Sequence, residues 1–102
     1  MFINMFMESR EIFIALSDET RFKIVSYLLE EERCACVIPQ LVGRAQPTVS
    51  LQLKKLVKLG VLETRRDGKK VMYKVRDSRV LRVLEAAGFK LRTKRTESIS
   101  KK

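Results

Sequence analysis

The fold of this chain is decided by the stretch Gln46–Pro47–Thr48–Val49–Ser50–Leu51–Gln52–Leu53–Lys54–Lys55–Leu56–Val57–Lys58–Leu59–Gly60. Its apolar residues recur at three- and four-residue spacing and share one face of a predicted helix: Val49, Leu53, Leu56 and Val57. The opposite face carries hydrogen-bonding side chains and a cation: Gln46, Thr48, Ser50, Gln52 and Lys55. Pro47 suits the first helical turn, and Gly60 suits the left-handed position after the last one. Such a helix fits a DNA major groove, although an ordinary amphipathic surface helix has the same pattern.

The composition indicates a nucleic-acid partner and argues against an enzyme. The 102 residues suffice for one domain, and 22 Lys and Arg against 12 Asp and Glu give a formal net charge of +10. No segment is apolar for long enough to span a bilayer, so nucleic acid is favoured over a membrane. The chain has no histidine, and no Ser–His pair, Cys–His pair or phosphate loop can be assembled. With no signal peptide and only two closely spaced cysteines, we expect a cytoplasmic protein.

Three further helices are expected before the central stretch. The first spans Met5 to Leu16 and is rich enough in aromatic residues to pack against a second copy of the chain. Ser17 or Asp18 caps the second, which runs from about Glu19 to Leu29 and ends at an acidic run. A short third helix begins near residues 37–39 and ends at Gly43, which leaves both cysteines in the preceding loop or at the helix mouth. A short helix, a turn and a polar-faced helix outline a helix-turn-helix.

The period then changes from 3.6 to 2, which predicts a two-stranded hairpin over residues 61–75 about an Asp67–Gly68 turn. Four cations crowd its tip, Arg65, Arg66, Lys69 and Lys70, and are explained by phosphate contacts, although a solvated hairpin is the alternative. A last helix follows Asp77–Ser78 and ends at Gly88. We therefore predict a mainly α fold with a small β-hairpin, a winged helix-turn-helix over residues 1–89. Residues 90–102 form a basic tail, expected to be disordered, that either adds DNA affinity or only aids solubility.

Several of these motifs together resemble the ArsR family of arsenic- and metal-responsive repressors. The similar segments, in the family's order, are the Ala15–Ile24 run, the Arg33–Val37 segment with its Cys-x-Cys pair, the Gln46–Ser50 start of the recognition helix with Leu53, and the wing from Leu59 to Tyr73. The resemblance spans about Ala15 to Val75. It implies a homodimer built from the first and last helices that binds a near-palindromic operator and releases it on sensing an inducer.

The sequence departs from the family's patterns at three places. Pro39 stands where arsenic sensors often have a third cysteine. Arg79 replaces the histidine of the zinc sensors' Asp-x-His, so a metal site between the last helices is not expected. Leu51, followed by Gln52, replaces the family's Arg or Gln, which predicts a different base preference.

Cys34 and Cys36 are the candidate metal ligands. Thiolates suit As(III), Cu(I), Cd(II) or Zn(II), but two thiolates without histidine do not complete a zinc shell, whereas trivalent arsenic accepts two plus an exogenous third ligand. Residues i and i+2 lie about 200° apart on a helix but on one side of an extended segment, so we expect capture to require an unwound start of the third helix. That change would shift the recognition helix. A redox switch, favoured by a lowered cysteine pKa, and two inert small hydrophobes remain alternatives.

The function expected from these features is a dimeric transcriptional repressor that needs no cofactor to bind double-stranded operator DNA and takes As(III) or another thiophilic ion as inducer. A redox-responsive regulator, and a basic architectural or protein-interaction winged helix without an inducer, are the alternatives. The candidate DNA-binding residues are Gln46, Thr48, Ser50, Gln52, Lys54, Lys55, Arg65, Arg66, Lys69 and Lys70. Of these, Gln46, Thr48, Ser50 and Gln52 are expected to touch base edges, and the cations to hold phosphates.

Overall fold

The computed structural model of the chain describes residues 2–91, with side chains from Ser9 onward. The predicted tail therefore lies, apart from its first two residues, outside the described residues. Within the described part, no helix is long and apolar enough to cross a membrane.

Five helices and three strands make up the described fold, in the order α1 (Phe2–Leu16), α2 (Glu19–Glu30), β1 (Arg33–Cys34), α3 (Ile38–Val42), α4 (Gln46–Lys58), β2 (Leu62–Asp67), β3 (Lys70–Val75) and α5 (Arg79–Ala86). All five predicted helices are present. Asp18 caps α2, because its carboxylate accepts a hydrogen bond from the Arg21 backbone N–H at 3.0 Å. Gly43 and Gly60 follow α3 and α4 with φ of 70° and 83°, the left-handed values expected after a helix.

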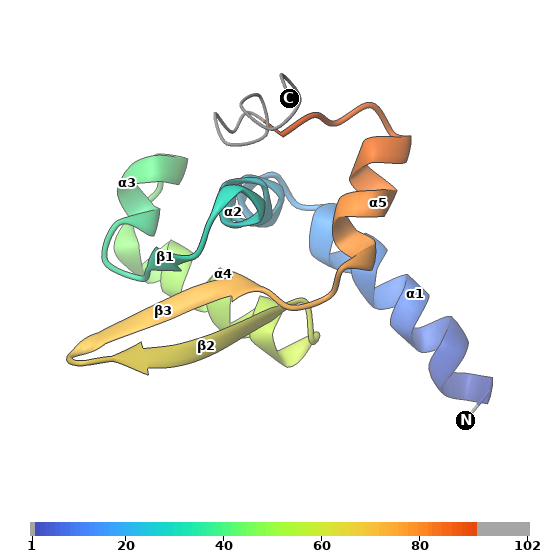
Figure 1. The fold of residues 1–102 in the computed structure, drawn as a ribbon, viewed down its shortest axis with the longest axis horizontal. Coiled ribbons are helices and arrows are strands. Elements are labelled where there is room, and N and C mark those ends of the chain that lie inside the picture. The colour runs from blue at the N-terminus through green and yellow to red at the C-terminus, as the bar shows by residue number, and fades with distance from the viewer. Residues whose placement is uncertain (1, 92–102) are drawn as a thin grey trace, which may run out of the picture.

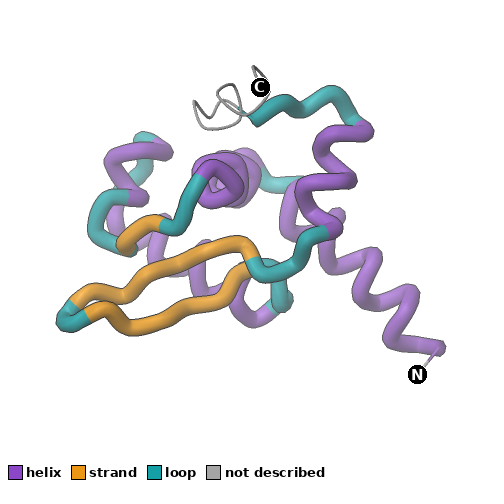
Figure 2. Tube along the Cα trace, in the orientation of Figure 1, coloured by secondary structure: helices purple, strands orange, loops and turns teal. Residues whose placement is uncertain are grey.

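The sheet has one more strand than the sequence predicted. The expected hairpin is β2 and β3, with Asp67 opposite Lys70 and Gly68, at φ 66°, supplying the positive angle of the turn. The two-residue strand β1 joins the other edge of β3, so the strand order is β1-β3-β2 (Figure 2). The prediction of a loop at Cys34 was therefore wrong. A two-residue strand carries no readable alternation, which is why the sequence did not reveal it.

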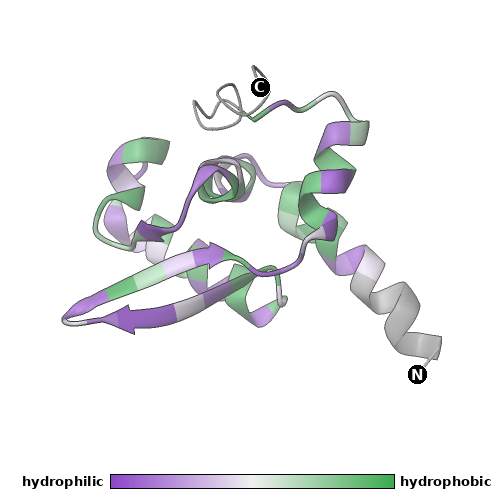
Figure 3. Cartoon of the chain, in the orientation of Figure 1, coloured by the Kyte–Doolittle hydropathy of each residue, from purple (hydrophilic) through white to green (hydrophobic). Residues whose placement is uncertain are grey.

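One core joins the helices to the base of the hairpin. Its buried residues are Ile12, Ala15, Ile24, Val25, Leu28, Ile38, Val42, Val49, Leu53, Leu56, Val61, Leu62, Val80 and Leu84. Val57 was assigned to the buried face of α4 but is 38% exposed, because it lies at the edge of that face. The hydrophilic colouring of β2 in Figure 3 marks a strand that leaves this core after its first residue, since within β2 only Leu62 is buried.

The two ends of the molecule carry different elements. Figure 1 shows α1 and α5 side by side at one end, while the tip of the β2–β3 hairpin projects from the other. Between them, α2 and α4 pack against each other, and α2 contacts β3 while α4 contacts β2. The hairpin tip thus stands apart from the α1–α5 pair.

Candidate functional site

Helix α4 turns a polar surface to solvent. Its buried face holds Val49, Leu53 and Leu56, which fixes the rotation of the helix about its axis. Five of its predicted DNA-binding residues are consequently exposed: Gln46, Thr48, Ser50, Lys54 and Lys55. Donors, acceptors and cations on one protruding helix can approach base edges and phosphates in a major groove.

Gln52, the sixth candidate on α4, is half-buried rather than exposed, and it is already hydrogen-bonded within the protein. Its side-chain oxygen accepts a hydrogen bond of 2.9 Å from Nη1 of Arg21. The same guanidinium donates to the carbonyls of Ile14 at 3.1 Å and Ala15 at 3.4 Å, in the last turn of α1. Arg21 therefore ties the end of α1 to the middle of α4. This role could not be predicted from the sequence, because a contact between residues 21 and 52 has no local signature.

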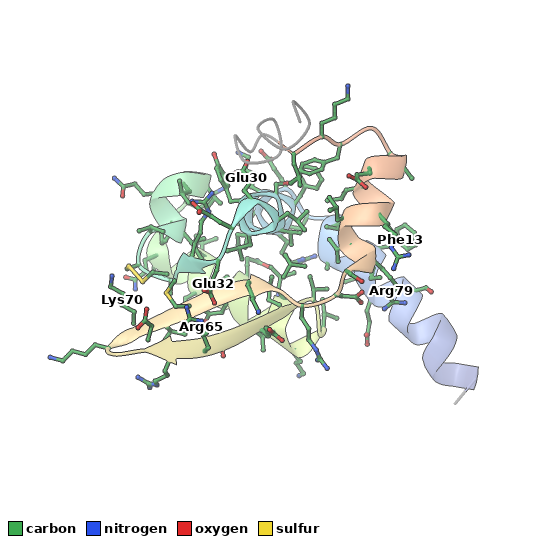
Figure 4. All side chains as sticks on the ribbon, in the orientation of Figure 1. Phe13, Glu30, Glu32, Arg65, Lys70 and Arg79 are labelled. Atoms are coloured by element: carbon green, nitrogen blue, oxygen red, sulfur yellow. A yellow bond between two sulfur atoms is a disulfide. The ribbon has the colours of Figure 1, made fainter. Side chains whose placement is uncertain are left out.

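The four predicted wing cations are all exposed, but they are not equivalent. Arg66, Lys69 and Lys70 form no ion pair with residues 9–91, whose side chains are described. Arg65 instead makes a bidentate pair with Glu32, with Nε and Nη2 each 2.7 Å from a carboxylate oxygen (Figure 4). The hydrogen bond from Arg65 lowers the pKa of Glu32, and the same pair raises the pKa of Arg65.

Both cysteines lie before α3, on the segment that β1 begins. Cys34 is buried and pairs with Met72 of β3, and the following N–H, that of Ala35, donates to the Val71 carbonyl at 2.9 Å. Cys36 is exposed in the turn that follows, with its Cα 5.1 Å from that of Cys34. The two sulfur atoms meet and are paired as a disulfide, drawn in yellow in Figure 4.

The position of the cysteines bears on the capture geometry expected from the sequence. The helix start was expected to unwind so that both sulfurs could face one ion. In the structure α3 begins only at Ile38, and the two sulfur atoms already meet across the turn that follows β1, where the Val37 N–H donates to the Cys34 carbonyl at 3.1 Å. The contacts of the cysteine segment are therefore what connects this pair to the rest of the fold.

Two such contacts leave the cysteine segment. One is the backbone pairing of Cys34 with β3, a strand of the wing. The other is a small pocket of about 60 Å³ in which Ala35 and Pro39 face Gln46 and Ser50 of α4. The residues next to the cysteines thus adjoin both elements that carry the candidate DNA-binding residues.

The start of α5 is occupied by an ion pair of its own. Arg79 donates to the Asp77 carboxylate from Nη2 at 2.6 Å and from Nε at 3.0 Å, and the Arg79 backbone N–H adds a third hydrogen bond of 3.0 Å. These bonds lower the pKa of Asp77. Its carboxylate is therefore paired with Arg79, the residue that stands in place of the zinc sensors' histidine. Among the described residues, no group of three or more His, Cys, Asp or Glu side chains that could hold a metal ion gathers here or elsewhere.

An apolar hollow separates α1 from α5. It encloses about 450 Å³ and is bordered by Ile12 and Phe13 of α1 and by Arg82, Val83 and Ala86 of α5. Phe13 is 60% exposed in the single chain and lies beside Arg79 in Figure 4. An exposed aromatic ring at the edge of an apolar hollow is a feature of protein–protein contacts.

Comparisons with known proteins agree with this architecture. The family model described as "Bacterial regulatory protein, arsR family" matches residues 18–64. A "Probable mercury resistance operon repressor" of Streptomyces lividans is 44% identical over 68 residues, which are 67% of this chain and 54% of the relative. A cadmium resistance transcriptional regulatory protein CadC homolog of Staphylococcus aureus is 38% identical over 79% of this chain and 68% of its own length. The chain thus spans little more than half of the first relative and about two thirds of the second.

Among solved structures, a homodimeric winged helix-turn-helix DNA-binding domain from Mycobacterium bovis superimposes with a TM-score of 0.74 at 25% identity. The match covers 83% of this chain and 79% of that one. The winged helix-turn-helix predicted from the sequence is therefore confirmed.

Proposed function

The chain belongs to the ArsR family of bacterial regulatory proteins, and on that premise we propose that it is a transcriptional repressor whose inducer is a thiophilic ion bound by Cys34 and Cys36. Members of this family are DNA-binding regulators and not enzymes, which confirms the expectation drawn from the composition. As(III) is the inducer that the two-thiolate site favours, because it needs only one further, exogenous ligand. The cytoplasm is the compartment that suits this proposal, since thiols stay reduced there.

The DNA-bound form is proposed to use α4 and the wing together. Gln46, Thr48, Ser50 and Gln52 would face base edges, and Lys54, Lys55 and the wing cations Arg65, Arg66, Lys69 and Lys70 would face phosphates. The exposure of most of these side chains and the net charge of +10 support this assignment.

A homodimer is proposed to form through α1 and α5. The apolar hollow between these helices and the exposed ring of Phe13 support this contact, because a second copy would remove both from water. Two recognition helices related by a two-fold axis would then read the two halves of a near-palindromic operator.

The observation that carries the proposed induction is the position of the cysteines relative to the wing. Cys34 is hydrogen-bonded into the sheet opposite Met72, and Met72 is in turn opposite Arg65 of β2. Cys36, two residues later, precedes α3 and the turn into α4. An ion that holds both sulfurs would fix the relative position of β1 and α3, and through them of the wing and α4. Ligand binding would then favour a conformation that fits the operator less well.

A redox switch is the second candidate, and the pairing of the two sulfur atoms as a disulfide is the observation that favours it. Oxidation of the two thiols by a peroxide would form the disulfide and two waters, and would constrain the same segment. Both candidates therefore act at one site and differ only in the chemical signal.

The test is a binding titration on a DNA duplex that the reduced protein itself has selected from a random-sequence pool. Arsenite, Hg(II), Cd(II) and hydrogen peroxide are added in separate arms to the wild type and to the Cys34→Ser and Cys36→Ser variants. We expect arsenite to release the wild type, and neither variant, from the duplex.

The arms separate the candidates. Release by peroxide alone would favour the redox switch over metal sensing. Release by Hg(II) or Cd(II), but not by arsenite, would identify that ion as the inducer in place of As(III). Release of both variants by arsenite would remove the cysteines from the mechanism. No release in any arm would leave an inducer-independent DNA-binding protein, and no enrichment of a sequence from the pool would overturn the repressor itself.

A further inference from the structure

Arg21 is a half-buried link between the end of one helix and a base-facing candidate of another. Its guanidinium donates to the carbonyls of Ile14 and Ala15 and to the side-chain oxygen of Gln52. Its backbone is fixed as well, because its N–H donates to the Asp18 carboxylate at the start of α2. Three acceptors from two other helices therefore hold the Arg21 side chain in one position.

The chemistry of this contact decides the orientation of the Gln52 amide. A carboxamide has an oxygen that accepts and an NH₂ group that donates, and the two ends are similar in shape. A guanidinium has five N–H donors and no acceptor, so only the oxygen of Gln52 can lie 2.9 Å from Nη1 of Arg21. The NH₂ group of Gln52 is consequently the end that points away from Arg21.

An unrestrained glutamine reads adenine, because its oxygen accepts from N6 while its NH₂ group donates to N7. Arg21 takes one of the two lone pairs of that oxygen and holds the oxygen on the protein side, which disfavours the adenine pattern and leaves the two NH₂ donors. The hydrogen bond from the charged guanidinium also polarises the Gln52 amide, which strengthens the N–H groups of that amide as donors. In the major groove, guanine offers two adjacent acceptors, N7 and O6.

We propose that Arg21 is a positioning residue for base recognition, which turns Gln52 from a reader of adenine into a donor to guanine. The inference rests on the proposed function, since it requires that Gln52 faces a base. The contact between Arg21 and Gln52 also gives a physical reason for a guanine preference that α4 alone would not have. Arg21 itself needs no contact with DNA in this arrangement.

The test compares the sequences that four proteins select from one random pool of DNA duplexes: the wild type, Arg21→Met, Gln52→Glu and Lys54→Gln. Arg21→Met keeps the apolar stem and removes all three donated bonds. Gln52→Glu keeps an acceptor for Arg21 and removes the NH₂ donors. Lys54→Gln is the matched control on the same helix, because loss of a phosphate contact weakens all sequences alike.

We expect the wild type to select a guanine in each half-site that Arg21→Met selects about tenfold less strongly over adenine, the size of one good base contact. Gln52→Glu should lose the same guanine, because a carboxylate cannot donate to it. Lys54→Gln should bind more weakly but select the wild-type sequence. Circular dichroism melting shows which variants are folded. If Arg21→Met does not fold, Gln52→Glu still decides the test.

The outcomes distinguish this inference from the proposed function. A wild type that selects no sequence would overturn both. A wild-type sequence that stays unchanged in folded Arg21→Met or in Gln52→Glu would overturn the inference alone. A uniform loss of affinity in Arg21→Met, without a change in base preference, would also overturn it, because that is the effect of a merely structural residue.

Discussion

Glu32 and Arg65 form a bidentate ion pair that spans the width of the sheet. Glu32 immediately precedes β1, and Arg65 lies on β2, the strand on the far side of β3. Both hydrogen bonds are 2.7 Å long. The segment that holds the cysteines is thus joined to the wing by a side-chain contact as well as by the backbone pairing of Cys34 with β3.

Because of this pair, Glu32 would compete with a DNA phosphate for the Arg65 guanidinium. We expect Arg66→Ala to reduce the slope of log K against log salt by about 0.9, the value of one phosphate contact on duplex DNA. Arg65→Ala should reduce it by less, because the Arg65 guanidinium is already neutralised by Glu32. Binding is measured by fluorescence anisotropy over a range of salt concentrations.

The matched variant for this comparison is Glu32→Gln, which leaves Arg65 free to face a phosphate. In the Glu32→Gln background, Arg65→Ala should reduce the slope of log K against log salt by as much as Arg66→Ala does. Equal slopes for the two arginine variants in the wild-type background would show that Glu32 does not compete with DNA.

The same pair makes the wing sensitive to acid. The hydrogen bond from Arg65 lowers the pKa of Glu32 from its ordinary value of 4.5. A lowered pKa in the folded state means that the pair contributes stability above pH 4.5 and loses it as the pH falls through the lowered value. In an NMR titration of the carboxyl carbons, Arg65→Gln should move the pKa of Glu32 back up toward 4.5. An unchanged pKa in the variant would mean that the pair does not form in solution.

The helices could be predicted from the sequence because their signals are local. Asp18 and Gly43 mark helix ends with chemistry that acts within a few residues, and the structure places both as expected. The hairpin followed from its turn and its alternation, with the turn residues shifted by one position. Strand β1 could not be predicted, since two residues have no period and the strand exists only because β3 offers it an edge.

The candidate site was predictable only as a set of residue types. The positions of Cys34 and Cys36 in sequence indicated thiolate chemistry, but the strand and turn that bring their sulfurs together depend on the pairing of β1 with β3. The roles of Glu32 and Arg21 escaped prediction because their partners lie about thirty residues away in sequence. Glu32 was recognised as part of an acidic run and Arg21 as part of a helix start. Neither motif indicates which distant residue the side chain contacts.

The cap of α2 provides a test of the fold that does not depend on function. Asp18→Ala removes the acceptor for the Arg21 backbone N–H and should lower the free energy of unfolding by about 1 kcal/mol. Asp18→Asn keeps a capping oxygen and is the matched control, expected to lose only a fraction of that amount. Urea unfolding followed by circular dichroism gives both values. A loss in Asp18→Asn as large as in Asp18→Ala would attribute the effect to charge rather than to capping.

The proposed dimer is tested at Phe13. A ring that is 60% exposed in the single chain, beside an apolar hollow between α1 and α5, should be covered in the dimer. Phe13→Glu would place a charge in that contact, and burial of one aromatic side chain stabilises a contact by about 2 kcal/mol. We therefore expect the dissociation constant of the dimer, measured by sedimentation equilibrium, to rise at least about tenfold.

Val57→Glu is the control for this substitution, because Val57 is an exposed apolar residue on α4, away from the hollow. It should leave the dissociation constant unchanged, while both variants keep the helical circular dichroism spectrum of the wild type. A dimer that survives Phe13→Glu but not Val57→Glu would move the interface from α1 and α5 to the recognition helix. Two half-sites could then not be read at once, because the surface that faces DNA would be buried between the subunits.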